Sequence, residues 1–398
     1  MEYRFSSMAS RLKPPSVRDR LKLSQGKDVI SFADEWPAEE LFPAHAVREA
    51  AGRVIAGGAG ALHGGAAEGY APLRVQLCGR MAARQMAATP EQMIVTAGSQ
   101  QAIDLLVSVL AEPGDAVLVE KPTSSARLQL FALRGLKAIE AESDEQGIVP
   151  EDAERLILEH RPKLMYASPT FGSPTGRVWS LERRTKLLAL CKHYQIPIIE
   201  DDPYGDLVFE PNERLPTLFA LEGGAERGTV FYASAFSGTV APPLRAGWAI
   251  GDSGVIRMAA KMKQAAGQHS SAFDQQILSR LLENFDLDAH IRQIAGACGE
   301  RMLEMHEQLL RQGLRDVSWQ KPKGGLFLWL ELPDGLDGEA LLRLSIRKGV
   351  SFVPGGQFYA QHPRRNCIRL NFACHAGERT KLGVERLAEA IGEFTARS

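Results

Sequence analysis

The chain has 398 residues, of which 44% are hydrophobic and 24% charged, with a formal net charge of -1. This length supports a large core and more than one domain, and the balanced charge, without a dense Lys/Arg block, gives no electrostatic footprint for nucleic acid or an anionic membrane. The start of the chain lacks an apolar signal core, and no apolar run reaches about 18 residues, so we expect a soluble cytoplasmic protein.

The cysteines give no sign of a metal site or a disulfide framework. There are five, scattered without paired metal-ligand spacing: Cys78, Cys191, Cys298, Cys367 and Cys374. Their odd number favours reduced thiols, and the sequence predicts no bound metal.

From about residue 93 onwards, short apolar runs alternate with amphipathic stretches. We expect strands at 93–96, 116–120, 164–167, 196–201, 230–233 and 246–250, and helices from about residue 100 and over 181–194. Apolar strands that alternate with helices predict an α/β fold with a mostly parallel sheet buried on both faces.

The pattern changes beyond about residue 290. A long helix over 290–312 is expected to lead to short strands at 325–330 and 367–372, which are typical of a smaller α/β domain. We therefore expect an N-terminal arm over residues 1–45 that joins the small domain, a large domain over 46–288 and a small C-terminal domain over 289–398.

Gly98, Ser99 and Gln100 lie between an expected strand and the start of a helix. The free N–H groups and positive dipole end of a helix N-terminus suit an anion such as phosphate. A Gly-Ser pair also caps helices for structural reasons alone, so this signal leaves both interpretations open.

The stretch from Phe231 to Trp248 carries the most informative motif, F-Y-A-S-A-F-S-G-T-V-A-P-P-L-R-A-G-W. It resembles the lysine motif of class I/II aminotransferases, the fold-type I enzymes that depend on pyridoxal phosphate (PLP), which reads roughly S-F-S-K-T-x-A-P-G-L-R-x-G. In that family the lysine forms a Schiff base with the cofactor, and the arginine binds its phosphate. The arginine matches Arg245, whereas the position of the lysine is Gly238.

The resemblance extends from about residue 5 to 395 and is closest to the subgroup of 2-aminoadipate and kynurenine aminotransferases and to the aminotransferase-like domains of MocR-type regulators. It rests also on G-S-Q-Q from Gly98, E-D-D-P-Y from Glu200 and C-I-R-L-N-F from Cys367. It implies the fold-type I architecture, with a large domain and a smaller one. The cofactor contacts that it implies are Ser99, Gln100, Ser173, Asp201, Tyr204, Ser237 and Arg245.

Three of the matching residues have defined roles in the family. The resemblance implies that Asp201 holds a pyridine nitrogen protonated and that Tyr204 bonds the phenolic oxygen of the cofactor. It implies that Arg369 binds the substrate α-carboxylate bidentately, a geometry that arginine supplies and lysine does not.

Other positions depart from the family pattern. Gly64 stands where a tyrosine reaches the neighbouring subunit's cofactor, Ser124 where a tyrosine stacks on the ring, Ser173 where an asparagine is usual, and Ala235 where a Ser or Thr binds phosphate. Without a lysine at Gly238, covalent anchoring, transaldimination and the proton shuttle are all lost. Lys261 and Lys263 would replace that lysine only if the fold turned one of them inward.

New chemistry would need other groups, and the candidates are Asp34, Glu35, His63 and Tyr204. Asp34 and Glu35 stand where the family has glycines beside the substrate, so they predict an acidic pocket wall; the alternative is that they are solvated loop charges. His63 has no partner at metal-ligand spacing, which favours a structural or surface histidine over a ligand.

Three hypotheses follow. The first is an enzyme that acts on a small carboxylate or amino-acid-like substrate without Schiff-base chemistry, either with noncovalent cofactor or with none. The second is an aminotransferase that uses noncovalent PLP or pyridoxamine phosphate. The third is a non-catalytic partner or ligand-sensing subunit. We expect a homodimer, or a heteromer with a lysine-bearing homologue.

Overall fold

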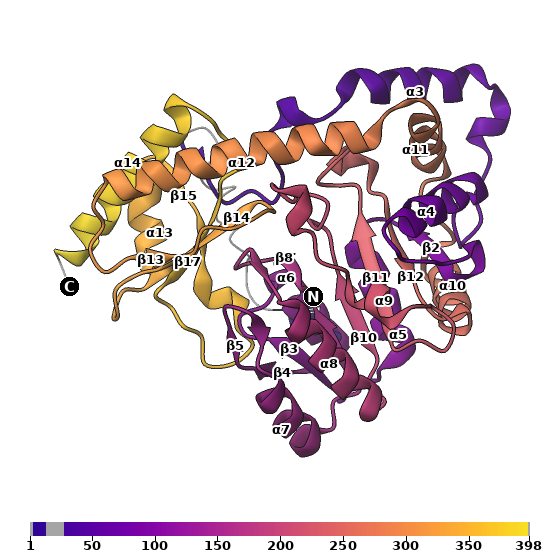
Figure 1. The fold of residues 1–398 in the computed structure, drawn as a ribbon, viewed down its shortest axis with the longest axis horizontal. Coiled ribbons are helices and arrows are strands. Elements are labelled where there is room, and N and C mark those ends of the chain that lie inside the picture. Colours follow the sequence, from indigo (N-terminus) through magenta and orange to yellow (C-terminus); the bar gives the residue numbers. More distant parts are fainter. Residues whose placement is uncertain (1–2, 13–27, 397–398) are drawn as a thin grey trace.

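A seven-stranded sheet forms the centre of the larger part of the molecule (Figure 1). The structure is a computed structural model, and it describes residues 3–12 and 28–396. The strand order is β2-β12-β11-β10-β7-β3-β4. The strands are β2 (Met93–Thr96), β3 (Ala116–Glu120), β4 (Lys137–Ala141), β7 (Leu164–Ala167), β10 (Ile198–Asp201), β11 (Val230–Ala235) and β12 (Gly247–Ile250). Only the pairs that involve β12 are antiparallel, which confirms the mostly parallel sheet.

Both faces of this sheet are covered because its strands are apolar on both sides. On β2, Ile94 belongs to one buried cluster, whereas Met93 and Val95 belong to the cluster on the other face. The first cluster includes α5 (Ser99–Leu110), α6 (Ser125–Arg134) and α10 (Ser253–Gly267). The other includes α3 (Ala44–Ala56), α4 (Ala71–Ala83), α7 (Pro150–His160), α8 (Leu181–His193), α9 (Leu218–Glu222) and α11 (Ala272–Asn284).

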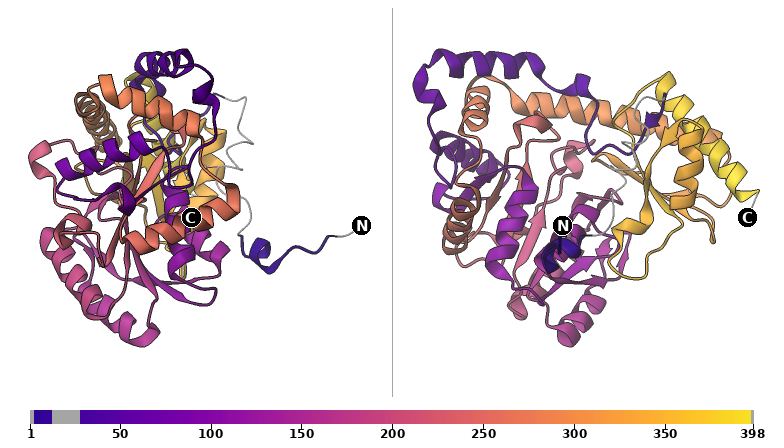
Figure 2. Two further views of the ribbon diagram at one scale, coloured as in Figure 1. Left: turned by 90° about the vertical axis from the view of Figure 1, so that its right-hand side faces the viewer. Right: turned by 180° about the vertical axis from the view of Figure 1, so that it is seen from behind.

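A second sheet, of order β13-β14-β17-β16, lies in the C-terminal part. Its strands are β13 (Ser318–Trp319), β14 (Phe327–Glu331), β16 (Val353–Pro354) and β17 (Cys367–Asn371), and they share a buried cluster with α12 (Leu287–Arg311), α13 (Gly338–Arg347) and α14 (Glu378–Thr395). Figures 1 and 2 show that α12 runs from the seven-stranded sheet to this smaller sheet.

The chain start and the C-terminal region meet in a two-stranded parallel pair. Ile30 of β1 (Ile30–Ser31) pairs with Val350 of β15 (Val350–Ser351). The segment near residue 30 therefore packs with the smaller sheet. Of the predicted arm, residues 1–2 and 13–27 lie outside the described part. The domain boundaries at 45 and 288 stay predictions.

Strand β4, several helices (among them α3, α4, α10 and α14) and several short elements were not predicted from the sequence. β4 reads Lys-Ala-Ile-Glu-Ala and lies at the sheet edge, where one side is partly exposed, so it lacks the continuous apolar run of its neighbours. Among the short elements are α1 (Ser7–Ser10), β5 (Ser143–Asp144), β6 (Gly147–Ile148), β8 (Thr170–Gly172) and β9 (Arg177–Val178).

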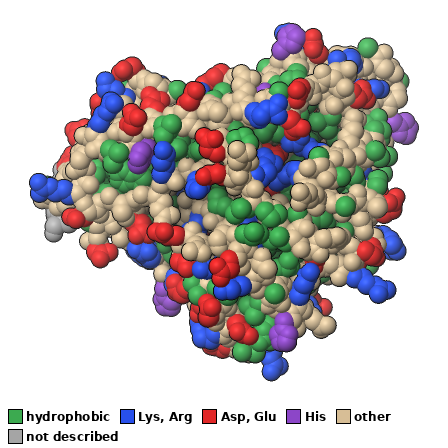
Figure 3. All heavy atoms as spheres, in the orientation of Figure 1, with side chains coloured by type: hydrophobic (Ala, Val, Ile, Leu, Met, Phe, Trp, Pro, Cys, Tyr) green, Lys and Arg blue, Asp and Glu red, His purple; other side chains and the backbone are tan. Residues whose placement is uncertain are grey.

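The surface carries no strong charge of one sign on the face seen in Figure 3, where acidic and basic side chains are interspersed. This agrees with the formal net charge of -1. Among residues 3–12 and 28–396, we find no helix that is both long and apolar enough to span a membrane.

Candidate functional site

A cavity of about 390 Å³ lies where several parallel strands end. Asp201 is the last residue of β10, Ala235 is the last of β11, and Ser168 follows β7. The carboxyl ends of strands in an open α/β sheet form the usual place for a ligand crevice. The lining residues are Glu35, Trp36, Gly98, Ser99, Gln100, Ser124, Ala126, Arg127, Tyr166, Ser168, Ser173, Asp201, Pro203, Tyr204, Ala235, Ser237, Gly238, Arg245 and Arg369.

One wall of the cavity is the N-terminus of α5. Gly98 caps this helix with φ of 88°, and it has no side chain to occupy the first-turn N–H groups, which lack intrahelical partners. A Cβ at Gly98 would come within 2.7 Å of Arg245 Nη2, so glycine leaves the space that the guanidinium fills. Arg245 Nη2 also donates to the carbonyl of Ala97, at 3.1 Å. The helix end and Arg245 together suit an anion.

Asp201 forms a buried polar centre at the end of β10. Its Oδ2 accepts hydrogen bonds from Arg127 Nε, at 2.9 Å, and from the Tyr166 hydroxyl, at 2.7 Å. Arg127 Nη2 also donates to Ser99 Oγ, at 3.1 Å, so one guanidinium joins Asp201 to the start of α5. Among the described residues, the buried Oδ1 of Asp201 has no hydrogen-bond partner. One oxygen of the Asp201 carboxylate therefore accepts two hydrogen bonds, and the other accepts none from the described residues.

Burial alters the acid–base properties of this centre. Burial alone would lower the pKa of Arg127, but the charge of Asp201 and the hydroxyl of Tyr166 raise it above its ordinary value. Burial, followed by the Asp201 charge, raises the pKa of Tyr166 well above 10. Arg127 is therefore a permanent cation at neutral pH, and Tyr166 a neutral donor.

Arg369 lies on the opposite side of the cavity, on β17. It is 3% exposed, and its Nη1 donates to Ser173 Oγ, at 2.9 Å. Its guanidinium carbon lies 4.1 Å from the ring centre of Phe327, which holds the side chain by a cation–π contact. Tyr204 also packs edge-on against Phe327, and burial, with the charge of Glu35, raises the pKa of Tyr204 above its ordinary range.

The structure brings most predicted site residues together. All seven predicted cofactor contacts, together with Arg369, Glu35 and Gly238, line the cavity. Asp34 and His63 do not line it. Both are exposed: Asp34 lies in an irregular segment after Ala33, and His63 follows a short helical turn on the surface. The catalytic roles of Asp34 and His63 stay predictions.

Neither candidate lysine points into the cavity. Lys263 Nζ is buried instead between the carbonyls of Ala67, at 2.8 Å, and Val95, at 2.7 Å, and burial lowers its pKa to about 8. Lys261 lies on the exposed side of the same helix. The condition that one of them turn inward is therefore not met.

Sequence reasoning missed Arg127 and Tyr166. Arg127 lies three residues after Ser124, one helical turn along α6, and this spacing could have indicated that both face the same wall. Tyr166 lies in the apolar strand β7, in which every residue is buried. This pattern is typical of a core residue and gave no sign of a site.

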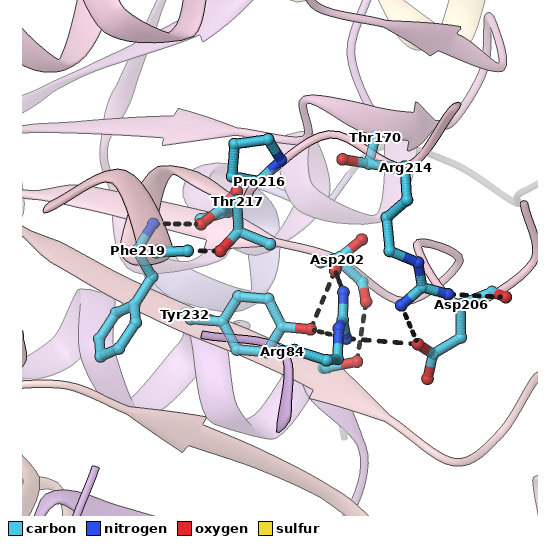
Figure 4. Close-up of polar contacts among 12 residues, drawn as sticks. Arg84, Thr170, Asp202, Asp206, Arg214, Pro216, Thr217, Phe219 and Tyr232 are labelled. Atoms are coloured by element: carbon cyan, nitrogen blue, oxygen red, sulfur yellow. Dashed lines mark hydrogen bonds and ion pairs between the residues drawn. The ribbon is translucent and has the colours of Figure 1, made fainter. Parts of the chain in front are cut away.

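A second polar cluster is centred on Asp202, the residue directly after β10 (Figure 4). Asp202 follows Asp201 and faces the other way, so its Oδ2 accepts from Arg84 Nη2, at 3.0 Å, and from the Tyr232 hydroxyl, at 2.9 Å. Arg84 Nη1 also lies 3.5 Å from Asp206 Oδ1. Burial alone would raise the pKa of Asp206, but the charges of Arg84, Arg80 and Arg214 hold it well below its usual range. This network fixes the backbone that presents Asp201.

Glu200 gives a testable pH dependence. Its carboxylate oxygens accept from the N–H groups of Leu218, at 2.8 Å, and Phe219, at 2.9 Å, and burial, with the charge of Asp202, raises its pKa to about 7. Because the ordinary value is 4.5, the folded chain binds this proton more tightly than the unfolded chain. Glu200 therefore adds about 3 kcal/mol to the free energy of unfolding below about pH 4.5, and this stabilisation is lost as the pH rises through about 7.

We expect Glu200→Gln to flatten this part of the pH dependence of the unfolding free energy. Urea denaturation of both proteins at about pH 5 and about pH 8 measures the slope. Equal slopes in the two proteins would show that Glu200 does not titrate in this range.

Comparisons with known proteins identify the family of this chain. The family model described as aminotransferase class I and II matches residues 30–389. The chain belongs to this family. It therefore has the fold-type I aminotransferase architecture, which confirms the fold expected from the sequence motifs.

Relatives of this aminotransferase-family chain cover nearly all of it. The 2-aminoadipate transaminase of Thermus thermophilus is 34% identical over 97% of the chain and 96% of the relative. The aromatic-amino-acid aminotransferase 1 of Thermococcus litoralis is 35% identical over 98% of the chain and 94% of the relative. The structure of the Pyrococcus horikoshii kynurenine aminotransferase, solved with PMP, has a TM-score of 0.92 at 35% identity and covers 98% of the chain and 97% of its own.

Proposed function

We propose that this aminotransferase-family protein is an enzyme that binds a small carboxylate or amino acid at Arg369 and acts on it without a lysine Schiff base. The observation that carries the proposal is that Gly238 lines the cavity and that no lysine is among the described lining residues. We assign Gly238 to the position of the family lysine from the motif alone. A glycine has no amine to anchor an aldehyde, accept a proton or speed cofactor exchange.

The loss of the lysine is not forced by lack of space. A Cβ at Gly238 would meet only the Pro203 carbonyl within 4 Å, at an ordinary 3.8 Å, and its φ lies outside the left-handed region. The backbone at Gly238 therefore accepts a Cβ without a clash. This supports a functional divergence of the site over a packing constraint at that position.

PLP is the cofactor of the aminotransferase family, and the residues that line the cavity fit one half of it. The phosphate half suits the N-terminus of α5 with Arg245, where the missing Cβ of Gly98 leaves room for the guanidinium. The ring half does not fit. Asp201, the residue expected at the pyridine nitrogen, already has Arg127 as its cation, and Ser124 cannot stack on a ring. We therefore assign no step to this cofactor.

The substrate end is preserved. Arg369 presents a buried guanidinium with Ser173 beside it, and arginine forms two parallel hydrogen bonds with a carboxylate. Glu35 and Tyr204 line the same cavity and are the groups placed to meet the rest of the substrate. With its raised pKa, Tyr204 would act there as a neutral hydrogen-bond donor.

A second candidate is an aminotransferase that holds PLP or pyridoxamine phosphate noncovalently. The open Oδ1 of Asp201 favours it, because a buried carboxylate oxygen without a partner can accept from a ligand N–H. This candidate needs both the cofactor and the second oxygen of Asp201. A ligand-sensing subunit without catalysis would use the same Arg369 contact and show no turnover.

The visible absorption spectrum of the purified protein, titrated with PLP and then with pyridoxamine phosphate, tests the proposal. We expect no saturable spectral change, while carboxylates bind in calorimetric titrations. Cofactor binding together with transfer of an amino group to a 2-oxo acid would overturn the proposal in favour of the second candidate. Carboxylate binding without turnover of any amino or 2-oxo acid tested would favour the sensing subunit.

A further inference from the structure

We infer that Arg127 is a specificity-determining residue that excludes the ring of pyridoxal phosphate, so that lysine alone would not restore the cofactor site. This inference rests on the proposed function and explains it further. It separates two causes, the missing amine at Gly238 and a protein cation placed on Asp201. The two causes are far apart in the chain and can be tested independently.

The first argument is position. Arg127 is 7% exposed and lines the cavity, and its guanidinium joins Asp201 Oδ2 to Ser99 Oγ through Nε and Nη2. Asp201 ends β10, and Ser99 opens the helix whose N-terminus forms the anion wall. A ligand that placed an anionic group at α5 and a ring at Asp201 would have to lie between these two residues. The guanidinium already bridges that interval.

The second argument is charge. A pyridine ring that binds a carboxylate through its nitrogen does so as a cation, and like charges on one carboxylate repel each other in a buried site. Arg127 keeps its charge at neutral pH, since the Asp201 charge outweighs the effect of burial on its pKa. The Tyr166 hydroxyl donates to the same Oδ2, so this oxygen of Asp201 already has two donors. Displacing Arg127 would break a buried ion pair, which is strongly unfavourable.

The third argument is volume. Ser124, the residue that caps α6 three positions before Arg127, lines the cavity, and so does Ala126. These small side chains leave the space into which the long Arg127 side chain extends. Small residues around one large buried cation are the arrangement expected if the arginine occupies the space of a ligand ring.

The test compares wild type, Gly238→Lys, Arg127→Ala and the double variant, each titrated with PLP by equilibrium dialysis and visible absorption. Borohydride reduction then traps any imine, which forms when the lysine amine condenses with the aldehyde and releases water. We expect Gly238→Lys alone to bind PLP weakly, and the double variant to bind it about tenfold more tightly or better and to give a reduced adduct at position 238.

Controls keep the test decisive. Arg134→Ala with Gly238→Lys removes an arginine from the same helix, but Arg134 pairs with Asp104 outside the cavity, so this protein should behave like Gly238→Lys alone. If Arg127→Ala fails to fold, Arg127→Gln removes the charge and keeps a donor for Asp201. A Gly238→Lys protein that loads PLP as tightly as the double variant would overturn the inference, and so would folded double variants that all stay empty.

This design separates the two proposals. If wild type itself binds PLP and transfers amino groups, the proposed function fails. If wild type stays empty and Gly238→Lys alone loads fully, the proposed function stands and the role of Arg127 fails.

Discussion

Replacing Arg369 with alanine is expected to weaken the binding of a small carboxylate by a factor on the order of 100, because a charged, bidentate hydrogen-bond partner is worth about 3 kcal/mol. Arg369 is the cavity arginine on the substrate side, held against Phe327 and beside Ser173. Calorimetric titration with maleate and with 2-oxoglutarate measures the loss. Arg369→Lys keeps the charge and loses the fork, so we expect an intermediate affinity.

Arg365→Ala provides the matched control. Arg365 precedes β17, is exposed and pairs with Asp337 at 3.3 Å, away from the cavity. Its loss should leave carboxylate affinity within about twofold of wild type, since exposed ion pairs contribute little. Unchanged affinity in Arg369→Ala would show that carboxylates bind elsewhere and would remove the substrate end of the proposed site.

Replacing Arg127 with alanine is expected to lower the free energy of unfolding by about 3–5 kcal/mol, because it leaves Asp201 as a buried charge without its cation. The Arg127–Asp201 pair is buried on both sides, with side chains 8% and 4% exposed. Urea denaturation at neutral pH measures the loss. The second change Asp201→Asn, added to Arg127→Ala, should recover part of it, since the unpaired charge is then gone.

Arg134→Ala is the comparison for stability as well. Arg134 also pairs with an aspartate through Nε, but its side chain is 38% exposed, so we expect a loss of only about 0–1 kcal/mol. Equal losses for Arg127→Ala and Arg134→Ala would mean that the Asp201 pair is not the buried, tightly coupled centre on which the inference about the ring depends.

The cavity and the pH-sensitive carboxyl lie on opposite sides of one strand. Asp201 and its neighbours Glu200 and Asp202 alternate between the two faces, as consecutive residues of a strand do. A single segment therefore provides a site residue, a buried acid with a raised pKa and an anchor for the arginine network. Changes to Glu200 or Asp202 act on Asp201 through the backbone.

The sequence by itself determined the parallel sheet, because each core strand is a short apolar run that must be covered on both faces and that alternates with a helix. Asp201 and Arg369 were singled out by the resemblance of E-D-D-P-Y and C-I-R-L-N-F to the family motifs, and not by local strand pattern. Edge strand β4 escaped because its exposure on one side removes the apolar run that marks its neighbours.

Only the tertiary structure decided what these residues do to one another. Arg127 and Asp201 are 74 residues apart, and their pairing depends on how α6 packs over the strand ends. Lys263 is one of the buried residues of helix α10, but its amine donates to the carbonyls of Ala67 and Val95, and it does not line the cavity. Local periodicity indicates which side of a helix is buried, but which partner a buried charge meets is set by long-range packing.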